Sequence, residues 1–295
     1  MSEPDRKDDD INPLLRDLER EFGQRRGADE GGGAEPAPTY GEAQPVAQPQ
    51  TYQLSLPLGR AQAVWVLLAL NVAIFAIPSL LQAVGVRVGG LGIYDYTLVA
   101  GAKDNTSIAQ DGQYYRFLTS MFLHGGWLHI GFNAWALYAL GPEAERIYTT
   151  GRFLALYFLA GLAGGVASYF FSAAPSVGAS GAIFGLIGGL AAFYYVSREL
   201  LGEMSRRQLG SLITVVMINL FIGFNSGGLI DNSAHIGGLV GGALVGWLLA
   251  PRLAVDERLY PPQVLRRSLA LGWPGALALL AVLVFLVMRL NPPIQ

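Results

Sequence analysis

Residues 178–195 read GASGAIFGLIGGLAAFYY, an apolar and small-residue run without a charged side chain. A helix of about 20 such residues crosses the hydrocarbon core of a bilayer. Gly181, Gly185 and Gly189 recur at every fourth position and therefore line one face of this helix. Small residues at that spacing let a second helix approach closely. The run predicts a membrane helix packed tightly against a neighbour.

Further apolar runs follow one another along the chain from residue 61 onward. Of its 295 residues 52% are hydrophobic and 14% are charged, whereas a soluble domain carries about a quarter charged residues. Apolar blocks of nearly spanning length occur at Ala61–Gln82, Phe117–Leu140, Phe153–Phe171, Ala179–Tyr195, Leu209–Phe224, Ser233–Leu249 and Trp273–Leu290. They predict an all-α polytopic membrane protein with seven spanning helices.

Three regions follow from this pattern. Residues 1–57 are polar and biased in composition, which predicts a disordered cytosolic tail with one short amphipathic helix after Asn12-Pro13. Residues 58–251 hold six helices, and residues 252–295 hold a cytosolic loop and the seventh helix. The chain has no cysteine, which excludes disulfides and thiol catalysis. Its net charge of −2 gives no reason to expect a nucleic-acid partner.

The positions of the basic residues predict the orientation. With the N-terminus inside, the cytoplasmic side receives Arg60, Arg146, Arg152, Arg198, Arg206, Arg207, Arg252, Arg258, Arg266 and Arg267. The outer side receives only Arg87, Lys103, Arg116 and Arg289. Because cytoplasmic loops carry an excess of Lys and Arg, this asymmetry favours an N-in, C-out arrangement.

Three spans in this topology enter from the outer face, and their first halves hold the candidate chemistry. The second span carries His124 and His129, the fourth carries Ser180, and the sixth carries His235. All three histidines of the chain and the serine therefore fall in one layer toward the outer surface. Ionisable groups inside a membrane are costly and mark functional sites by default.

The hydroxyl of Ser180 and the imidazole of His235 are the two groups that a serine nucleophile and its general base require. The alternative is that Ser180 bonds to its own helix and His235 to a neighbouring carbonyl. Asp231 either orients the imidazole of His235 or, as we favour, caps the sixth helix. Phe184, one turn after Ser180, either stacks on His235 or serves as a packing aromatic.

Acyl transfer also needs hydrogen-bond donors for the oxyanion. His129 and Asn133 are four residues apart and share a helix face, and the backbone N–H of Ser180 is a third candidate. His124 is better explained by hydrogen bonding between helices. The rival use of three histidines is a zinc site, but His124 and His129 are five apart and no HExxH motif is present. We therefore expect neither a metal nor another cofactor.

The set of motifs resembles the rhomboid family of intramembrane serine proteases. The resemblance rests on Gly178-Ala179-Ser180-Gly181, on Ala234-His235, and on His124, His129 and Asn133, and it runs from about Gly101 to Ala250. It implies a Ser180–His235 dyad without a required aspartate. It also implies an oxyanion site formed by His129 and Asn133, supported by His124 and Gly178.

Other features are expected from the resemblance alone. The loop Val84–Arg116 corresponds to a membrane-embedded first loop, and Leu209–Phe224 corresponds to a lateral gate for substrate. Tyr115-Arg116 stands where the family often has Trp-Arg, and Phe184 stands where a tyrosine often packs on the histidine.

The resulting hypothesis is an endopeptidase in the bilayer, most simply that of a bacterial inner membrane. Its partners would be single-span membrane proteins, cut near the outer end of their transmembrane segment. A non-proteolytic escort of transmembrane helices and a seven-helix zinc-dependent lipid amide hydrolase remain as alternatives. The sequence does not predict an oligomeric state.

Overall fold

The computed structural model describes residue 56 and residues 58–290. The amphipathic helix expected after Asn12 lies outside these described residues, as does most of the expected tail.

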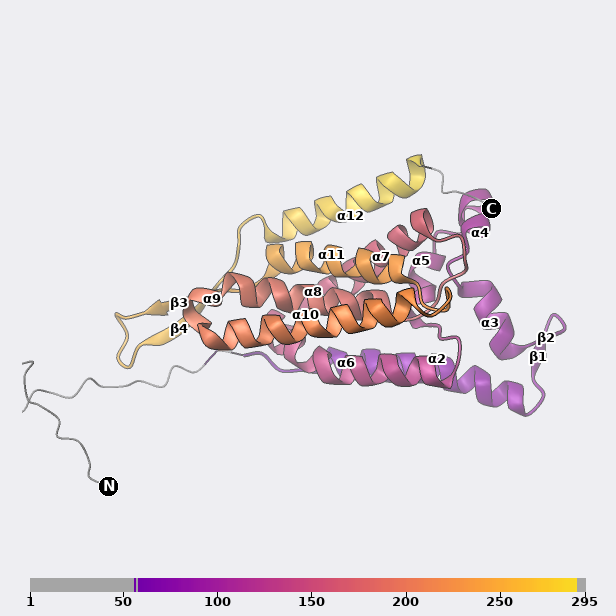
Figure 1. The fold of residues 1–295 in the computed structure, drawn as a ribbon, viewed down its shortest axis with the longest axis horizontal. Coiled ribbons are helices and arrows are strands. Elements are labelled where there is room, and N and C mark those ends of the chain that lie inside the picture. The colour runs from indigo at the N-terminus through magenta and orange to yellow at the C-terminus, as the bar shows by residue number, and fades with distance from the viewer. Residues whose placement is uncertain (1–55, 57, 291–295) are drawn as a thin grey trace, which may run out of the picture. The chain divides into compact units, whose positions relative to one another are not determined.

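Long helices form a bundle (Figure 1). They are α2 (Ala63–Ala83), α6 (Trp127–Tyr148), α7 (Thr150–Phe171), α8 (Ser180–Val196), α10 (Glu203–Phe224), α11 (Asn232–Leu249) and α12 (Gly272–Arg289). By length and composition α2, α7, α10 and α12 are able to cross a membrane, and α8 is a shorter apolar helix. The predicted all-α polytopic membrane fold is confirmed.

Helix α8 forms the centre of the bundle. All residues from Gly181 to Leu190 are buried, and α8 packs against both α7 and α11. A helix that is apolar on all sides is expected in such a position.

The contact between α8 and α11 is a contact between backbones. A methyl group added at Gly238 would lie 2.0 Å from the carbonyl oxygen of Gly181, and one added at Gly242 would lie 2.1 Å from that of Gly185. The paired residue numbers rise together along both helices, so α8 and α11 run parallel. This is the close approach that the four-residue glycine spacing predicts.

Shorter elements lie at the two ends of the bundle (Figure 1). One end carries the two-stranded β1 (Arg87–Val88) and β2 (Leu91–Gly92), then α3 (Ile93–Gly101), α4 (Asn105–Asp111), α5 (Arg116–Thr119) and the 3-10 turn η1 (Ser120–Phe122). The other end carries α9 (Arg198–Leu201) and the antiparallel pair β3 (Arg252–Asp256) and β4 (Gln263–Arg267).

The expected second span, Phe117–Leu140, is wrong at both ends. The chain leaves helical geometry after η1, and α6 begins only at Trp127 and continues to Tyr148. The polar end of α6 stays helical because Glu145 is fully buried with its hydrogen bonds satisfied. Its two carboxylate oxygens accept the backbone N–H groups of Ala63 and Val64, each at 2.9 Å. This carboxylate therefore satisfies N–H groups that the first turn of α2 leaves free.

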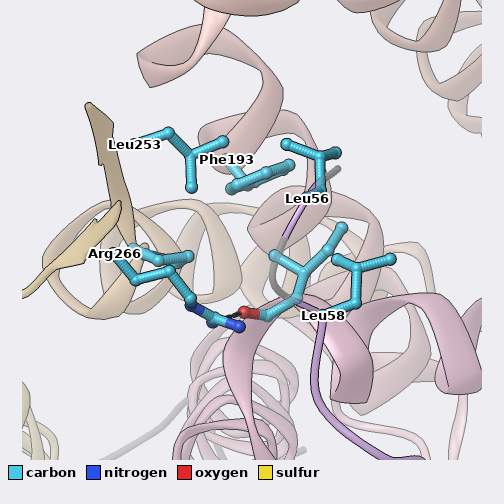
Figure 2. A pocket seen from close by; sticks show the side chains of 7 residues that line it. Leu56, Leu58, Phe193, Leu253 and Arg266 are labelled. Atoms are coloured by element: carbon cyan, nitrogen blue, oxygen red, sulfur yellow. Dashed lines mark hydrogen bonds between the residues drawn. The ribbon is translucent and has the colours of Figure 1, made fainter. Parts of the chain in front are cut away.

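The segment expected as a plain loop after residue 252 contains the β3–β4 hairpin instead. Arg266 on β4 donates to the carbonyl of Ile147 at the end of α6. Beside this contact lies a small apolar pocket, which Figure 2 shows between the hairpin, α8 and the chain that precedes α2. Its lining includes Leu56, Leu58, Phe193 and Leu253.

Candidate active site

Ser180 is the first residue of α8 and is half-buried. The first N–H groups of a helix have no partner within it and point out of its N-terminus. The preceding Gly178 has a backbone φ of +128°, which side chains rarely tolerate, and its N–H donates to the carbonyl of Ser120 at 2.9 Å. The backbone conformation of Gly178 and its hydrogen bond to Ser120 therefore determine the turn that precedes Ser180.

Gly178 also separates Ser180 from His129. A methyl group added at Gly178 would lie 3.7 Å from Oγ of Ser180 and 2.7 Å from Nε2 of His129. The N–H of Gly125 donates to Nδ1 of His129 at 3.4 Å. Because Nδ1 accepts, the proton of the neutral imidazole sits on Nε2. His129 thus has a donor directed toward the surroundings of Ser180.

Asn133 lies one turn further along α6 and is buried. Its side-chain amide donates to the carbonyl of His129 at 2.9 Å. This bond within the helix uses one N–H of the amide group and leaves the second for another acceptor.

His124 lies in the loop before α6 and not on a spanning helix as expected. It is buried, and its ring meets that of His129 edge-on with centroids 5.1 Å apart. The hydroxyl of Tyr94 donates to the backbone carbonyl of His124 at 2.7 Å. Burial, and secondarily the neighbouring His129, lowers the pKa of His124 to about 4, so its ring is neutral. The observed contact between the two histidines is thus one of ring packing, and among the described residues neither ring nitrogen of His124 has a hydrogen-bond partner.

His235 lies in the first turn of α11 and is buried. Its ring stacks on Phe184 of α8, with centroids 4.2 Å apart and the planes within 11°. Phe184 follows Ser180 by one helical turn, so the ring of His235 lies against α8 one turn from the serine. Among the described residues nothing is hydrogen-bonded to the buried Nδ1 of His235. A buried polar atom without a partner is rare in folded proteins and requires a reason.

Asp231 caps α11. One carboxylate oxygen accepts the N–H of Ala234 at 3.0 Å, and the other accepts the hydroxyl of Ser168 on α7. Both oxygens are thus engaged away from the imidazole of His235. Of the two roles considered for Asp231, the geometry supports the helix cap.

A pocket with both polar and apolar lining opens beside Ser180. Gly178 and Ser180 line it together with Lys103, Ser120, Ser168 and Ser176. Lys103 and Ser168 were not expected here. One feature of the sequence could have pointed to Lys103: it is one of few charged residues on the predicted outer side. A buried cation needs a specific set of hydrogen-bond acceptors. Within the described part of the chain, no three His, Cys, Asp or Glu side chains are grouped to hold a metal ion.

Comparison with known proteins identifies the family to which the chain is similar. The family model for the Rhomboid domain matches residues 111–252. The chain is similar to rhomboid protease GluP of Bacillus subtilis (strain 168), with 44% identity over 180 residues, which is 60% of this chain and 34% of GluP. It is also similar to the putative rhomboid protease YdcA of the same organism, with 33% identity over 152 residues, or 51% of this chain and 73% of YdcA.

A plant relative gives the same match. RHOMBOID-like protein 9, chloroplastic, of Arabidopsis thaliana is 30% identical over 195 residues, which cover 66% of this chain and 44% of that protein. The chain therefore spans less than half the length of GluP and of this plant relative.

Proposed function

This chain belongs to the rhomboid family, and we propose that it is an intramembrane serine endopeptidase with Ser180 as nucleophile and His235 as base. The observation that carries the proposal is the close parallel packing of α8 on α11. It sets His235 against Phe184, one turn from Ser180, inside the bundle.

The reaction follows from these groups. The hydroxyl of Ser180 attacks the carbonyl carbon of the scissile peptide bond while the imidazole of His235 accepts its proton. The resulting imidazolium returns a proton to the leaving amine, and an acyl-enzyme remains. A water molecule, deprotonated by His235, then attacks the acyl carbon and releases the new carboxyl end with a free Ser180.

The oxyanion is stabilised by donors gathered around the start of α8. These are the free backbone N–H of Ser180, Nε2–H of His129 and the second amide N–H of Asn133. Each such donor contributes about 3 kcal/mol to the transition state. Gly178 leaves room for His129 to reach this position.

The base works without a carboxylate partner in this proposal. Asp231 is occupied by Ala234 and Ser168. The stacked ring of Phe184 instead fixes the plane of the imidazole of His235. A dyad of this kind needs close packing of the two helices, which the glycines provide.

The substrates in this proposal are single-span membrane proteins cut near the outer end of their transmembrane segment. A helical peptide bond has its carbonyl hydrogen-bonded, so the substrate must unwind at the cut. Small or helix-breaking residues near the cut are therefore preferred. Substrate enters beside α10, whose side chains are largely exposed. Near the outer face, the amide of Asn232 ties α11 to the carbonyl of Leu220 on α10, at 3.3 Å.

The protein is a multi-pass membrane protein, and we place it N-in and C-out in a bacterial cell membrane. The orientation is supported by the arginines of α9, β3 and β4 at one end of the bundle. The host is supported by the Bacillus subtilis relatives.

The test is cleavage of a transmembrane model substrate by the purified protein in lipid vesicles. Wild type, Ser180→Ala and His235→Ala are compared with and without a chelator. Only the wild type should cleave, and the chelator should have no effect. Cleavage by Ser180→Ala rejects the serine mechanism, and chelator-sensitive cleavage supports a metal hydrolase. If the wild type and both variants bind the substrate and none of them cleaves it, the escort alternative is supported.

A further inference from the structure

Lys103, between α3 and α4, is a buried cation that the proposed reaction does not use. Its side chain is 1% exposed. Its ammonium group donates to Oδ1 of Asn105 at 3.1 Å and to three backbone carbonyls. These carbonyls belong to Ser168 at 3.4 Å, Ser172 at 3.0 Å and Ala174 at 2.9 Å. A buried charge is tolerated only with such a complete set of acceptors.

The acceptors lie where α7 ends and the chain turns toward α8. The last four carbonyls of a helix have no partner within it, and the helix dipole makes this end negative. Lys103 supplies a positive charge and donors there. The amide of Asn105 adds bonds to the carbonyls of Tyr169 at 3.1 Å and Ser172 at 3.2 Å. Together Lys103 and Asn105 cap α7.

The backbone of Lys103 holds the next part of the same segment. Lys103 and Ser176 exchange two backbone hydrogen bonds, each 2.9 Å long. Two residues later, Gly178 is pinned by the carbonyl of Ser120. The segment between α7 and α8 is therefore hydrogen-bonded to Lys103 of the loop Val84–Arg116 at three residues, namely Ser172, Ala174 and Ser176.

Ser168 links this attachment to the helix of the base. Its carbonyl accepts from Lys103, and its hydroxyl donates to the carboxylate of Asp231. Asp231 caps α11 through Ala234, directly before His235. A continuous set of hydrogen bonds thus runs from Lys103 through Ser168 and Asp231 to the first turn of α11.

We infer that Lys103 is a positioning residue that fixes Ser180 relative to His235, with Ser168 carrying the link between the two catalytic helices. This inference rests on the proposed function. Lys103 makes no contact with reacting atoms. It acts by holding the Ser172–Ser176 segment in place. Because this segment leads into α8, it fixes the position of Ser180 at the start of that helix.

The kinetic consequence is specific. Loss of the clamp displaces the nucleophile without removing a substrate contact, so kcat falls while KM stays nearly constant. A displacement of about 1 Å in a reacting group costs about 10²-fold in rate. We therefore expect Lys103→Met, which keeps the apolar stem of the side chain and removes the ammonium group, to lower kcat by about 10-fold to 10²-fold.

The experiment measures kcat and KM on a transmembrane model substrate in vesicles, with the thermal unfolding midpoint of each variant. The variants are Lys103→Met, Lys103→Arg, Ser168→Ala and, as a control, Glu145→Gln. Glu145 is an equally buried charge bonded to backbone groups, but it lies at the far end of α6. The rate at which a fluorophosphonate probe labels Ser180 is measured in parallel, because it reports the nucleophile without a protein substrate.

The expected result is a lower kcat and slower labelling for Lys103→Met and Ser168→Ala at unchanged KM. Lys103→Arg, which keeps the charge and donors, should recover part of the rate, and Glu145→Gln should keep the wild-type kcat. Wild-type kcat in a folded Lys103→Met or Ser168→Ala overturns the inference. An equal loss in Glu145→Gln overturns it too, because general destabilisation then explains the effect.

Two further outcomes are distinct from these. If Lys103→Met does not fold, Ser168→Ala decides, since it removes only a hydroxyl. If wild type neither cleaves nor is labelled, or if Ser180→Ala still cleaves, the proposed function fails and not the positioning alone.

Discussion

Substituting Gly242 by alanine tests the close contact of α8 with α11 without touching the catalytic groups. Gly242 lies two helical turns beyond His235 and is buried against Gly185. The added methyl group would lie 2.1 Å from the carbonyl oxygen of Gly185 and 2.3 Å from its Cα. Both neighbours are backbone atoms, so no side chain can rotate away to make room.

The size of the effect follows from these distances. Ordinary contacts of a methyl group begin near 3.4 Å, so the two helices must separate by roughly 1 Å. Overpacking of this kind costs about 1–3 kcal/mol of stability. Because Ser180 is on α8 and His235 is on α11, the same separation opens the dyad. A misplacement of about 1 Å lowers the rate by about 10²-fold.

The assay is cleavage of a transmembrane substrate in vesicles, with the helix content of each variant checked by circular dichroism. Gly210→Ala is the matched control, since it makes the same change in α10 and a methyl group there meets nothing within 4 Å. It should keep the wild-type rate. Full activity in a folded Gly242→Ala would show that the dyad does not depend on this contact.

Three further predictions concern single side chains. Asn133→Ala should lower kcat by about 10²-fold to 10³-fold if its free amide N–H binds the oxyanion, and an unchanged kcat removes it from that role. Phe184→Leu should lower kcat by about fivefold, as expected for an aromatic stack of about 1 kcal/mol, whereas Phe184→Tyr should keep the rate; equal rates in all three proteins would show that the stack is only packing. Burial lowers the pKa of Lys103 to about 8 against the opposing charges of Asp231 and Asp104, so its clamp weakens and kcat should fall as pH rises through about 8. This fall in kcat should be absent in Lys103→Arg. If kcat falls at high pH in both proteins alike, the titrating group is not Lys103. Stability should change with pH in the opposite direction to kcat. The pKa of Lys103 is lower in the folded than in the unfolded state, so its contribution to the free energy of unfolding should rise as pH increases above about 8 and the buried charge is lost.

The sequence predicted those parts of the structure that depend on regular spacing. The four-residue spacing of Gly181 and Gly185 predicted a close approach by a neighbouring helix, and α11 makes that approach through Gly238 and Gly242. The placement of the histidines and Ser180 in one outer layer stays a prediction, and His124 lies in the loop before α6 and not on a span.

The parts that were missed depend on contacts between distant segments. The polar end of α6 remains helical because Glu145 accepts N–H groups from α2, which lies about 80 residues earlier. The β3–β4 hairpin is held to the end of α6 through Arg266. Lys103 was counted only as an outer charge, since its acceptors on α7 and in the following loop are backbone carbonyls that no side-chain pattern reveals.

The most direct test of the central claim is to find which atom reacts. The protein is incubated with a fluorophosphonate, and the modified peptide is identified by mass spectrometry in wild type and in His235→Ala. The account predicts phosphonylation of Ser180 alone, at a rate that falls sharply when His235 is removed. Modification of another residue, or equal labelling of Ser180 without the imidazole, would contradict it.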